Sequence, residues 1–307
     1  MFQSTTTLLG RLSLILAAST QGFAAAAAAF LNSRQAAPTE IARQASLENI
    51  AVRPNGQLLV TNMNSPNLYA VDPVTKKVST AVAVSGASGM SGIGEIAPDV
   101  FVVIGGSPQG TAVHKIDFTS GTTAQATLIK KIADAKNMNG LAVFNNDTVL
   151  LADAGKGNVV KLTVSTGESS VAISDPTMAP SGPIGFGIDG LKYDSSTGTV
   201  WYTNIFKNSF HKVSVDTASK PTGAVSTLWS NLMGDDLCFG NNGKLYITTN
   251  SGANQVVEFD AAGSASTKPV VVAKLNAPTA CAAGRGETDK NVVYVTNGQG
   301  VYAFTVK

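Results

Sequence analysis

The chain has 307 residues, of which 44% are hydrophobic and only 14% are charged, and its formal net charge is +2. A chain this rich in apolar residues does not have the composition of an intrinsically disordered protein. Its 22 Lys and Arg residues predict neither a nucleic-acid groove nor a polybasic membrane surface. Two cysteines and two histidines exclude a zinc finger, a Cys-x-x-Cys redox motif and a His-Glu-x-x-His zinc site.

The first thirty residues have the pattern of a secretory signal peptide. A polar start with one positive charge at Arg11 is followed by the apolar run 12–18 and by small residues that end at 24–29. A membrane-spanning helix needs about 20 apolar residues, and polar residues at 19–22 interrupt this run. We therefore predict a cleaved signal peptide over 1–29 and a secreted or lumenal protein without a membrane span, although several alanines satisfy the cleavage rule. An uncleaved anchor and an alanine-rich helix without a targeting role are the alternatives.

After residue 47 one pattern recurs six times: an apolar strand, a turn, a second apolar strand, a turn rich in Gly, Asn or Ser, and a third strand. The equivalent first strands begin at residues 49, 91, 139, 189, 236 and 279. A period of about 40–50 residues with several short strands is typical of a β-propeller, whereas a β-sandwich does not explain a repeat of this length. We predict an all-β, six-bladed β-propeller that forms a single domain over 30–307. Residues 31–47 are expected to supply an outer strand that joins the last blade and leaves no exposed edge.

Polar residues recur where the first strands begin and where the second strands end, two places that a propeller brings to one mouth of its central channel. The first set is Glu48, Asn49, Ser91, Asn137, Asn139, Asp189, Asp235, Asp236 and Thr279, and the second is Asn62, Gly105, Asp153, Asn204, Asn250 and Asn297. One interpretation is turn chemistry, because Asn and Asp bind local backbone groups. The other is a ring of hydrogen-bonding groups around an apolar funnel.

Under the second interpretation the ring supplies two groups of functional candidates. The candidates for the reacting mouth are Asn49, Asn139, Asp189, Asp236, Asn204 and Asn250. The candidates for substrate binding are Asn62, Asp153, Thr279 and Asn297. His114 and His211 both precede a lysine in a third strand, so we expect them on the blade surface and not in acid–base roles.

Two further features fit an oxidising compartment. Cys238 and Cys281 lie 43 residues apart, and we expect them at the same position of adjacent blades, next to the channel. A disulfide there would link blades five and six if the Cα atoms come within about 7 Å, and two buried free thiols are the alternative. Asn146-Asp147-Thr148 is a sequon for glycosylation of Asn146.

Several of these segments resemble the SMP-30/gluconolactonase-like six-bladed propellers. The resemblance rests on Glu48, Asn139-Gly-Leu141, Asp189-Gly-Leu191 and Asp235-Asp-Leu-Cys-Phe239. It implies a divalent cation such as calcium, held in the funnel by Glu48, Asn139, Asp189 and Asp236, that polarises a lactone carbonyl and activates water. The chain departs from the family pattern at Glu48-Asn-Ile50, where the family has Glu-Gly-Pro, and at Asp189, where it has Asn.

Other segments resemble a fungal secreted branch of this superfamily, which includes the hetero-Diels-Alderases of tropolone–sesquiterpenoid biosynthesis. They are Ile50–Thr61, Asn139–Val143 and Asp289–Thr296. This resemblance implies a cofactor-free cycloaddition between a tropolone-type quinone methide and a terpenoid alkene, two small apolar substrates that the funnel holds in a near-attack geometry. It is the leading hypothesis. A metal-dependent lactone hydrolase is the alternative, and a non-catalytic extracellular binding propeller is the third possibility.

Overall fold

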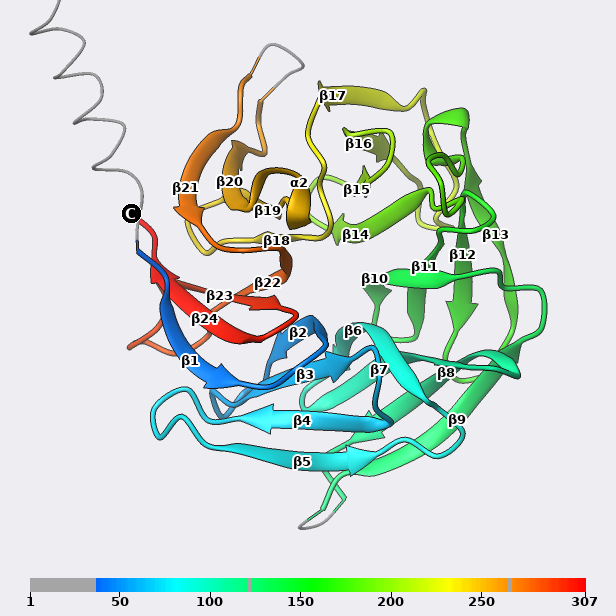
Figure 1. Cartoon of the computed structure of the whole chain (residues 1–307). Helices are drawn as coiled ribbons and strands as arrows, with labels where there is room; N and C mark the ends of the chain where they lie inside the picture. The colour runs from blue at the N-terminus through cyan, green and yellow to red at the C-terminus, as the bar shows by residue number, and fades with distance from the viewer. Residues whose placement is uncertain (1–36, 121–122, 264–266) are drawn as a thin grey trace, which may run out of the picture. The chain divides into compact units, whose positions relative to one another are not determined.

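A computed structural model describes residues 37–120, 123–263 and 267–307. The predicted signal peptide and its cleavage site lie outside the described residues. Within the described part, six four-stranded antiparallel sheets follow one another along the chain and surround a common centre (Figure 1). The predicted all-β, six-bladed β-propeller is therefore confirmed. No helix of the described residues is long and apolar enough to cross a membrane.

Each of the first five blades is a simple meander of four strands. Blade 1 contains β2 (Leu47–Val52), β3 (Leu58–Asn62), β4 (Asn67–Val71) and β5 (Val78–Ala83); blade 2 contains β6 (Gly89–Ala97), β7 (Val100–Ser107), β8 (Gly110–Asp117) and β9 (Gln125–Ile132); blade 3 contains β10 (Met138–Asn145), β11 (Thr148–Asp153), β12 (Asn158–Thr163) and β13 (Ser169–Ser174). Blade 4 contains β14 (Ile188–Asp194), β15 (Thr199–Asn204), β16 (Ser209–Ser214) and β17 (Ser226–Ser230); blade 5 contains β18 (Leu237–Phe239), β19 (Lys244–Thr248), β20 (Gln255–Asp260) and β21 (Val270–Lys274).

The last blade closes the ring with a strand from the start of the described chain. It consists of β22 (Pro278–Ala283), β23 (Val292–Asn297), β24 (Gly300–Thr305) and β1 (Thr39–Arg43). β1 pairs antiparallel with β24, with Thr39 opposite Ala303 and Arg43 opposite Gly300. Figure 1 shows this pairing where the blue and red ends of the ribbon meet. The expected outer strand from residues 31–47 is thus present, and it satisfies an edge that would otherwise be open.

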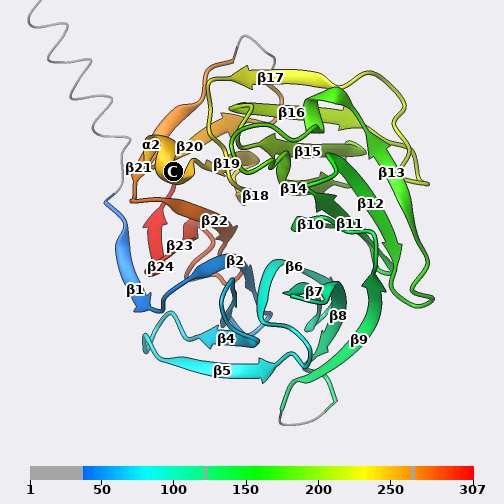
Figure 2. The same cartoon turned by 45° about the vertical axis from the view of Figure 1, so that its right-hand side comes forward.

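Each repeat has a fourth strand that the three-strand pattern does not predict. The fourth strands β5, β9, β13, β17 and β21 occupy the outer edge of their blades, which Figure 2 shows for β5, β9 and β17. Most residues of β5, β9 and β13 are exposed or half-buried. Because an outer-edge strand packs against little, its sequence need not alternate cleanly between apolar and polar residues.

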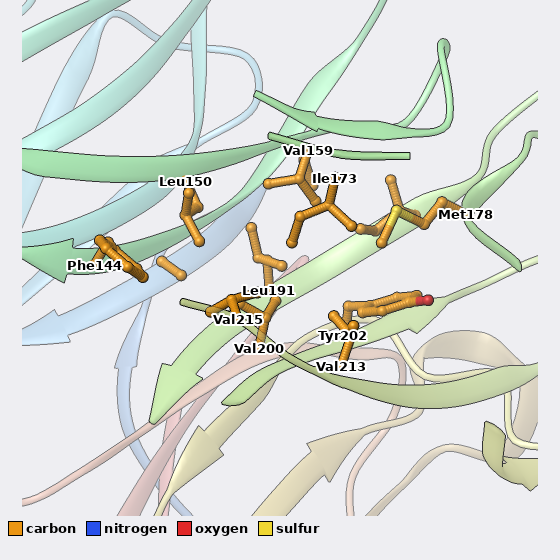
Figure 3. Close-up of a cluster of buried hydrophobic side chains, with 13 residues drawn as sticks. Phe144, Leu150, Val159, Ile173, Met178, Leu191, Val200, Tyr202, Val213 and Val215 are labelled. Carbon is orange, nitrogen blue, oxygen red and sulfur yellow. The ribbon is translucent and has the colours of Figure 1, made fainter. Parts of the chain in front are cut away.

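The apolar side chains of the strands pack between neighbouring blades, not within a single central core. One such cluster lies between blades 3 and 4, where Leu150 and Val159 of one sheet pack with Leu191, Val200 and Tyr202 of the next (Figure 3). Similar clusters join blades 1 and 2, blades 2 and 3, blades 4 and 5, and blades 6 and 1. This packing fixes the angle between sheets, and it leaves the inner strands β2, β6, β10, β14, β18 and β22 nearest the centre in both views (Figures 1 and 2).

Cys238 and Cys281 form a disulfide between blades 5 and 6, with 5.6 Å between their Cα atoms. The expectation that they occupy the same position of adjacent blades is wrong by one residue. Leu237 pairs with Ile247 as Cys281 pairs with Val295, so Cys281 corresponds to Leu237 and not to Cys238. Successive side chains of a strand face opposite sides of the sheet, so an offset of one is what turns the two sulfur atoms toward each other.

Candidate functional site

The inner strands share a local distortion at the predicted ring residues. Five of the six have a shift in strand register there, between 47 and 50, 90 and 93, 138 and 141, 188 and 191, and 278 and 281. The two residues inside each shift have no regular pairing partner on the second strand. A bulge of this kind re-aims a side chain, and here it affects Glu48, Asn139 and Asp189.

Threonines near the ends of the second strands bind the distorted backbone. Thr61, Thr203, Thr248 and Thr296 each accept a hydrogen bond from an inner-strand backbone N–H, at 2.8–3.2 Å. Three of them also donate across the boundary to the next blade, as Thr296 does to the Glu48 carbonyl. These threonines were not predicted as site residues, although a Thr directly precedes Asn62, Asn204 and Asn297 in the sequence.

The threonine bonds also define which residues are equivalent. Thr61 receives the amide of Asn49 and Thr248 receives the amide of Asp236. In blade 4 the amide bound by the threonine is that of Gly190, the residue after Asp189. The residues that correspond to Asp189, and to Asn139 in blade 3, are therefore Glu48 and Asp235. The strand starts assigned from the sequence at 49 and 236 are each one residue late, because an acidic or amide residue occupies both positions in those repeats.

Four carboxyl groups and one amide come together at this level. The Asn139 Nδ2 donates to Asp189 Oδ1 at 2.6 Å across the boundary between blades 3 and 4, and the Asn139 Oδ1 is buried with no hydrogen-bond partner. Asp235 accepts a hydrogen bond from Asn250, which begins the short helix α2 (Asn250–Ala253). Glu48 and Asn139 are 8% and 9% exposed, and the aspartates are more deeply buried. We call Glu48, Asn139, Asp189, Asp235 and Asp236 the acid cluster.

The acid cluster favours protonated carboxyl groups. Burial, with a contribution from the charge of Asp236, raises the pKa of Glu48 to about 7. Burial together with neighbouring carboxylates also raises the pKa values of Asp189 and Asp235 well above the usual range. Desolvation disfavours the charged form of an acid, and nearby like charges add to that effect. The cluster can therefore hold neutral carboxyl groups near neutral pH, and a neutral carboxyl group donates a hydrogen bond.

Lys192 supplies the positive charge beside the acid cluster, and the sequence analysis did not single it out. It lies on β14, three residues after Asp189, and its Nζ is 2.9 Å from both carboxylate oxygens of Asp236. The side chain of Lys192 is 21% exposed and that of Asp236 is 3% exposed. The pairing joins blades 4 and 5 at the inner strand β14.

The predicted second-strand-end residues bind loops. Asn62 Nδ2 donates to the Ala45 carbonyl at 2.6 Å, and Asn297 Nδ2 donates to the Asn276 carbonyl at 2.9 Å. Asn204 does the same with two carbonyls before β14, and Asp153 accepts from backbone amides before β10. Each also accepts an amide from the turn after its own strand. These bonds fit the turn interpretation.

Two other ring candidates are also engaged by the backbone. The Thr279 Oγ1 donates to the Glu48 carbonyl at 2.9 Å, which joins blades 6 and 1. Asn49 lies one position after Glu48 and is 3% exposed, and its amide is bound by Thr61. The structure thus brings Asn139, Asp189, Asp236 and Asn250 into or against the acid cluster, while Asn62, Asp153, Asn204 and Asn297 clamp loops.

The residues expected to hold a divalent cation do not fit one as they are arranged. Both oxygens of Asp236 face the Lys192 ammonium. Asn139 turns an N–H toward Asp189. Over the described ranges, no three His, Cys, Asp or Glu side chains lie close enough together to hold a metal ion. The unpartnered Asn139 Oδ1 is the one feature of this set that a cation would favour, and we derive no chemical step through a metal.

The molecule has three cavities outside the acid cluster, of which one lies at a blade boundary. One of about 730 Å³ is lined by Ile41, Pro54 and Tyr294, among others, between blades 1 and 6. Two more, of about 520 and 530 Å³, lie beside His114 and beside Tyr302. None of the three is lined by the acid cluster. Within the acid cluster, Glu48 and Asn139 have the largest exposed fractions.

Both histidines are buried, contrary to the expected surface position. His114 is 5% exposed and His211 is 2% exposed. His211 stacks on Tyr202 and is 2.7 Å from the Ser209 Oγ. Burial lowers the pKa of His211 to about 4, so it is neutral at pH 7. Third strands alternate between buried and more exposed positions, and both histidines occupy buried ones. A third-strand position therefore does not by itself imply exposure.

Glycines allow the inner strands to approach each other at the acid cluster. A Cβ on Gly140 would lie 2.2 Å from the Asp189 carbonyl oxygen, whereas Gly106 of β7 has nothing within 4 Å. We expect Gly140→Ala to lower the free energy of unfolding by about 2–3 kcal/mol, because blades 3 and 4 must separate to admit the methyl group. Urea denaturation measures the effect, and Gly106→Ala is the matched control. Equal stabilities for the two variants would contradict this packing.

The chain is similar to two fungal proteins over most of its length. It is 28% identical over 298 residues to a Phoma sp protein named "Putative hetero-Diels-Alderase", covering 81% of this chain and 82% of that protein. It is 23% identical to "Putative hetero-Diels-Alderase asR5" of Sarocladium schorii, covering 81% and 74%. The resemblance to the hetero-Diels-Alderase branch is thereby confirmed. No family model matches the chain.

Solved structures support the fold. The gluconolactonase XC5397 of Xanthomonas campestris has a TM-score of 0.67 with 11% sequence identity, covering 87% of this chain and 89% of that one. At this identity the likeness establishes the propeller architecture alone. The resemblance to SMP-30/gluconolactonase-like propellers is confirmed at the level of the fold.

Proposed function

We propose that this six-bladed propeller, which resembles the hetero-Diels-Alderases, is a pericyclase that joins an electron-poor heterodiene to an alkene at the acid cluster. The observation that carries the proposal is the similarity to two proteins of that name over 81% of the chain. We further propose a tropolone-type quinone methide and a terpenoid alkene as the two substrates. In this cycloaddition one C–C bond and one C–O bond form while the π bonds rearrange, so every atom of both substrates stays in the product.

The reaction needs no nucleophile and no redox group, and the site's chemistry is suited to it. A quinone methide becomes more reactive when a hydrogen-bond donor stabilises the negative charge that develops on its carbonyl oxygen. Glu48, protonated below about pH 7, is such a donor and is among the more exposed members of the acid cluster. Holding both substrates in a near-attack geometry contributes up to about 7–11 kcal/mol in favourable cases.

The test is cycloaddition by the purified protein with a quinone methide generated in solution and a terpenoid alkene. We expect a faster reaction than in buffer and one dominant stereoisomer, measured by chiral chromatography. The rate should fall as the pH rises above about 7, where Glu48 ionises and stops donating. Glu48→Gln keeps an N–H donor, so its rate should be nearly independent of pH, whereas Glu48→Leu should be slow at every pH.

Two results would count against this function. A stereoisomer ratio equal to that in buffer would contradict the proposed pericyclase activity. Hydrolysis of lactones that a chelator abolishes would favour the gluconolactonase-like alternative instead.

We also propose that the protein is secreted. The apolar run 12–18, the Cys238–Cys281 disulfide and the sequon support this. Asn146 is exposed in the two-residue turn between β10 and β11, where a glycan can be attached without steric conflict. Loss of a glycosidase-sensitive mass in Asn146→Gln, expressed in a fungal host, tests glycosylation directly.

A further inference from the structure

Lys192 pairs with Asp236, the member of the acid cluster whose charge affects the other three carboxyl groups. Its ammonium faces both oxygens of Asp236 at 2.9 Å. The charge of Asp236 is in turn felt by Glu48, Asp189 and Asp235, since it contributes to raising the pKa of each. Through Asp236, one lysine therefore neutralises part of a group of four buried carboxyl groups.

The position of the ammonium is also the position that a cation bound by Asp236 would need. A divalent ion binds a carboxylate from the side that its two oxygens share, and the Lys192 Nζ lies there. Two cations cannot share that place, because they repel each other strongly in a buried site. The backbone of β14 also lies close to this carboxylate, since a Cβ added at Gly190 would be 2.6 Å from the Asp236 Oδ1.

We propose that Lys192 is the resident cation of the channel, taking the place of a divalent metal ion so that the native protein binds none at the acid cluster. The inference does not depend on the proposed reaction. Its corollary is that removing the ammonium exposes a latent divalent-cation site. The Asp236 carboxylate would then lack its positive partner, in a cluster where the Asn139 Oδ1 is already without a hydrogen-bond partner. Oxygen ligands of this kind suit a hard cation such as Ca²⁺.

The experiment compares divalent-cation binding in three proteins. Wild-type protein, Lys192→Met and Lys212→Met are purified without chelator, analysed for bound metal and titrated with Ca²⁺ by calorimetry and thermal melting. Lys212 is the control because it lies on β16 of the same blade, with its Nζ over the Trp201 ring at 5.0 Å. Met preserves the length of the lysine side chain without its charge.

We expect the wild-type protein and Lys212→Met to contain no stoichiometric metal and to show no saturable Ca²⁺ binding below about 1 mM. Lys192→Met should bind Ca²⁺ at least about tenfold more tightly and melt at a higher temperature when Ca²⁺ is present. Stoichiometric metal in the wild-type protein, or equal Ca²⁺ affinity in the wild type and Lys192→Met, overturns the proposal.

A variant that retains the charge covers the case in which Lys192→Met does not fold. Lys192→Arg should remain free of divalent metal, as the wild type does. The wild-type measurement alone is decisive against the proposal if Ca²⁺ binds in the micromolar range. Because both readouts are binding and melting, a failed cycloaddition assay would not affect them.

Discussion

Replacing both cysteines with alanine is expected to cost about 4 kcal/mol of stability. The Cys238–Cys281 disulfide closes a loop of 43 residues, and a loop of this length restricts the unfolded chain by about that amount in the loop-entropy model. The loop contains most of blade 5, so the unfolded chain without the bond gains the freedom of an entire blade. For a domain of this size the loss corresponds to a fall in melting temperature of roughly 8 °C.

The measurement is guanidinium denaturation of the wild-type protein and the Cys238→Ala/Cys281→Ala variant, each with and without reductant. Reductant should lower the midpoint of the wild-type protein toward that of the variant and leave the variant unchanged. Thiol titration of the denatured, unreduced wild-type protein should find no free thiol. Two titratable thiols, or identical midpoints for both proteins in the absence of reductant, would refute a stabilising bridge.

The blade count and the ring closure could be predicted because the second strands are strongly marked. Segments such as Val149–Asp153 and Val292–Asn297 are apolar, buried on both faces and end in Asn or Asp. Apolar composition, burial on both faces and a terminal Asn or Asp recur in most repeats, since each second strand contacts two neighbouring blades. The outer strands could not be predicted in the same way, because exposure on one side removes the need for apolar residues there.

The site was predicted in part. Glu48, Asn139 and Asp189 were expected together, and the structure brings them together with Asp235. The loop clamps such as Asn62 have the same residue types at equally regular positions, so sequence alone cannot distinguish a channel group from a turn group. What separates them is the bulge in the inner strand.

Lys192 was missed for a different physical reason. Lys192 lies between two apolar residues, Leu191 and Tyr193, so the sequence predicts only a polar, outward-facing position of an alternating strand. Its partner Asp236 lies 44 residues away on the next blade, and nothing local marks the pair. The one-residue error in the cysteine registry has the same origin, because a period near 43 residues does not reveal which face of a strand a side chain occupies.

Stability should fall by about 3 kcal/mol as the pH rises from 4.5 to 7 because of one buried group. The pKa of Glu48 is raised from 4.5 to about 7 by burial and by the charge of Asp236. Below pH 4.5 the carboxyl group is protonated in both the folded and the unfolded protein, so burial carries no charge penalty. Between these values the unfolded state loses its proton first, and above about pH 7 the full cost of a buried charge is present.

Glu48→Gln isolates this contribution. The variant should equal the wild-type protein in stability at pH 4.5 and exceed it by about 3 kcal/mol at pH 8, where the wild type holds an ionised carboxylate in a buried place and the amide does not. Urea denaturation at both pH values measures the difference, and Glu287→Gln, at an exposed glutamate that pairs with Lys290, controls for the loss of a charge. Because Asp189 and Asp235 have pKa values raised partly by Glu48, the substitution should also ease their ionisation and flatten the remaining pH dependence. A variant less stable than the wild type at pH 8 would mean that Glu48 is ionised and paired in the folded protein, and that a cation other than Lys192 satisfies it.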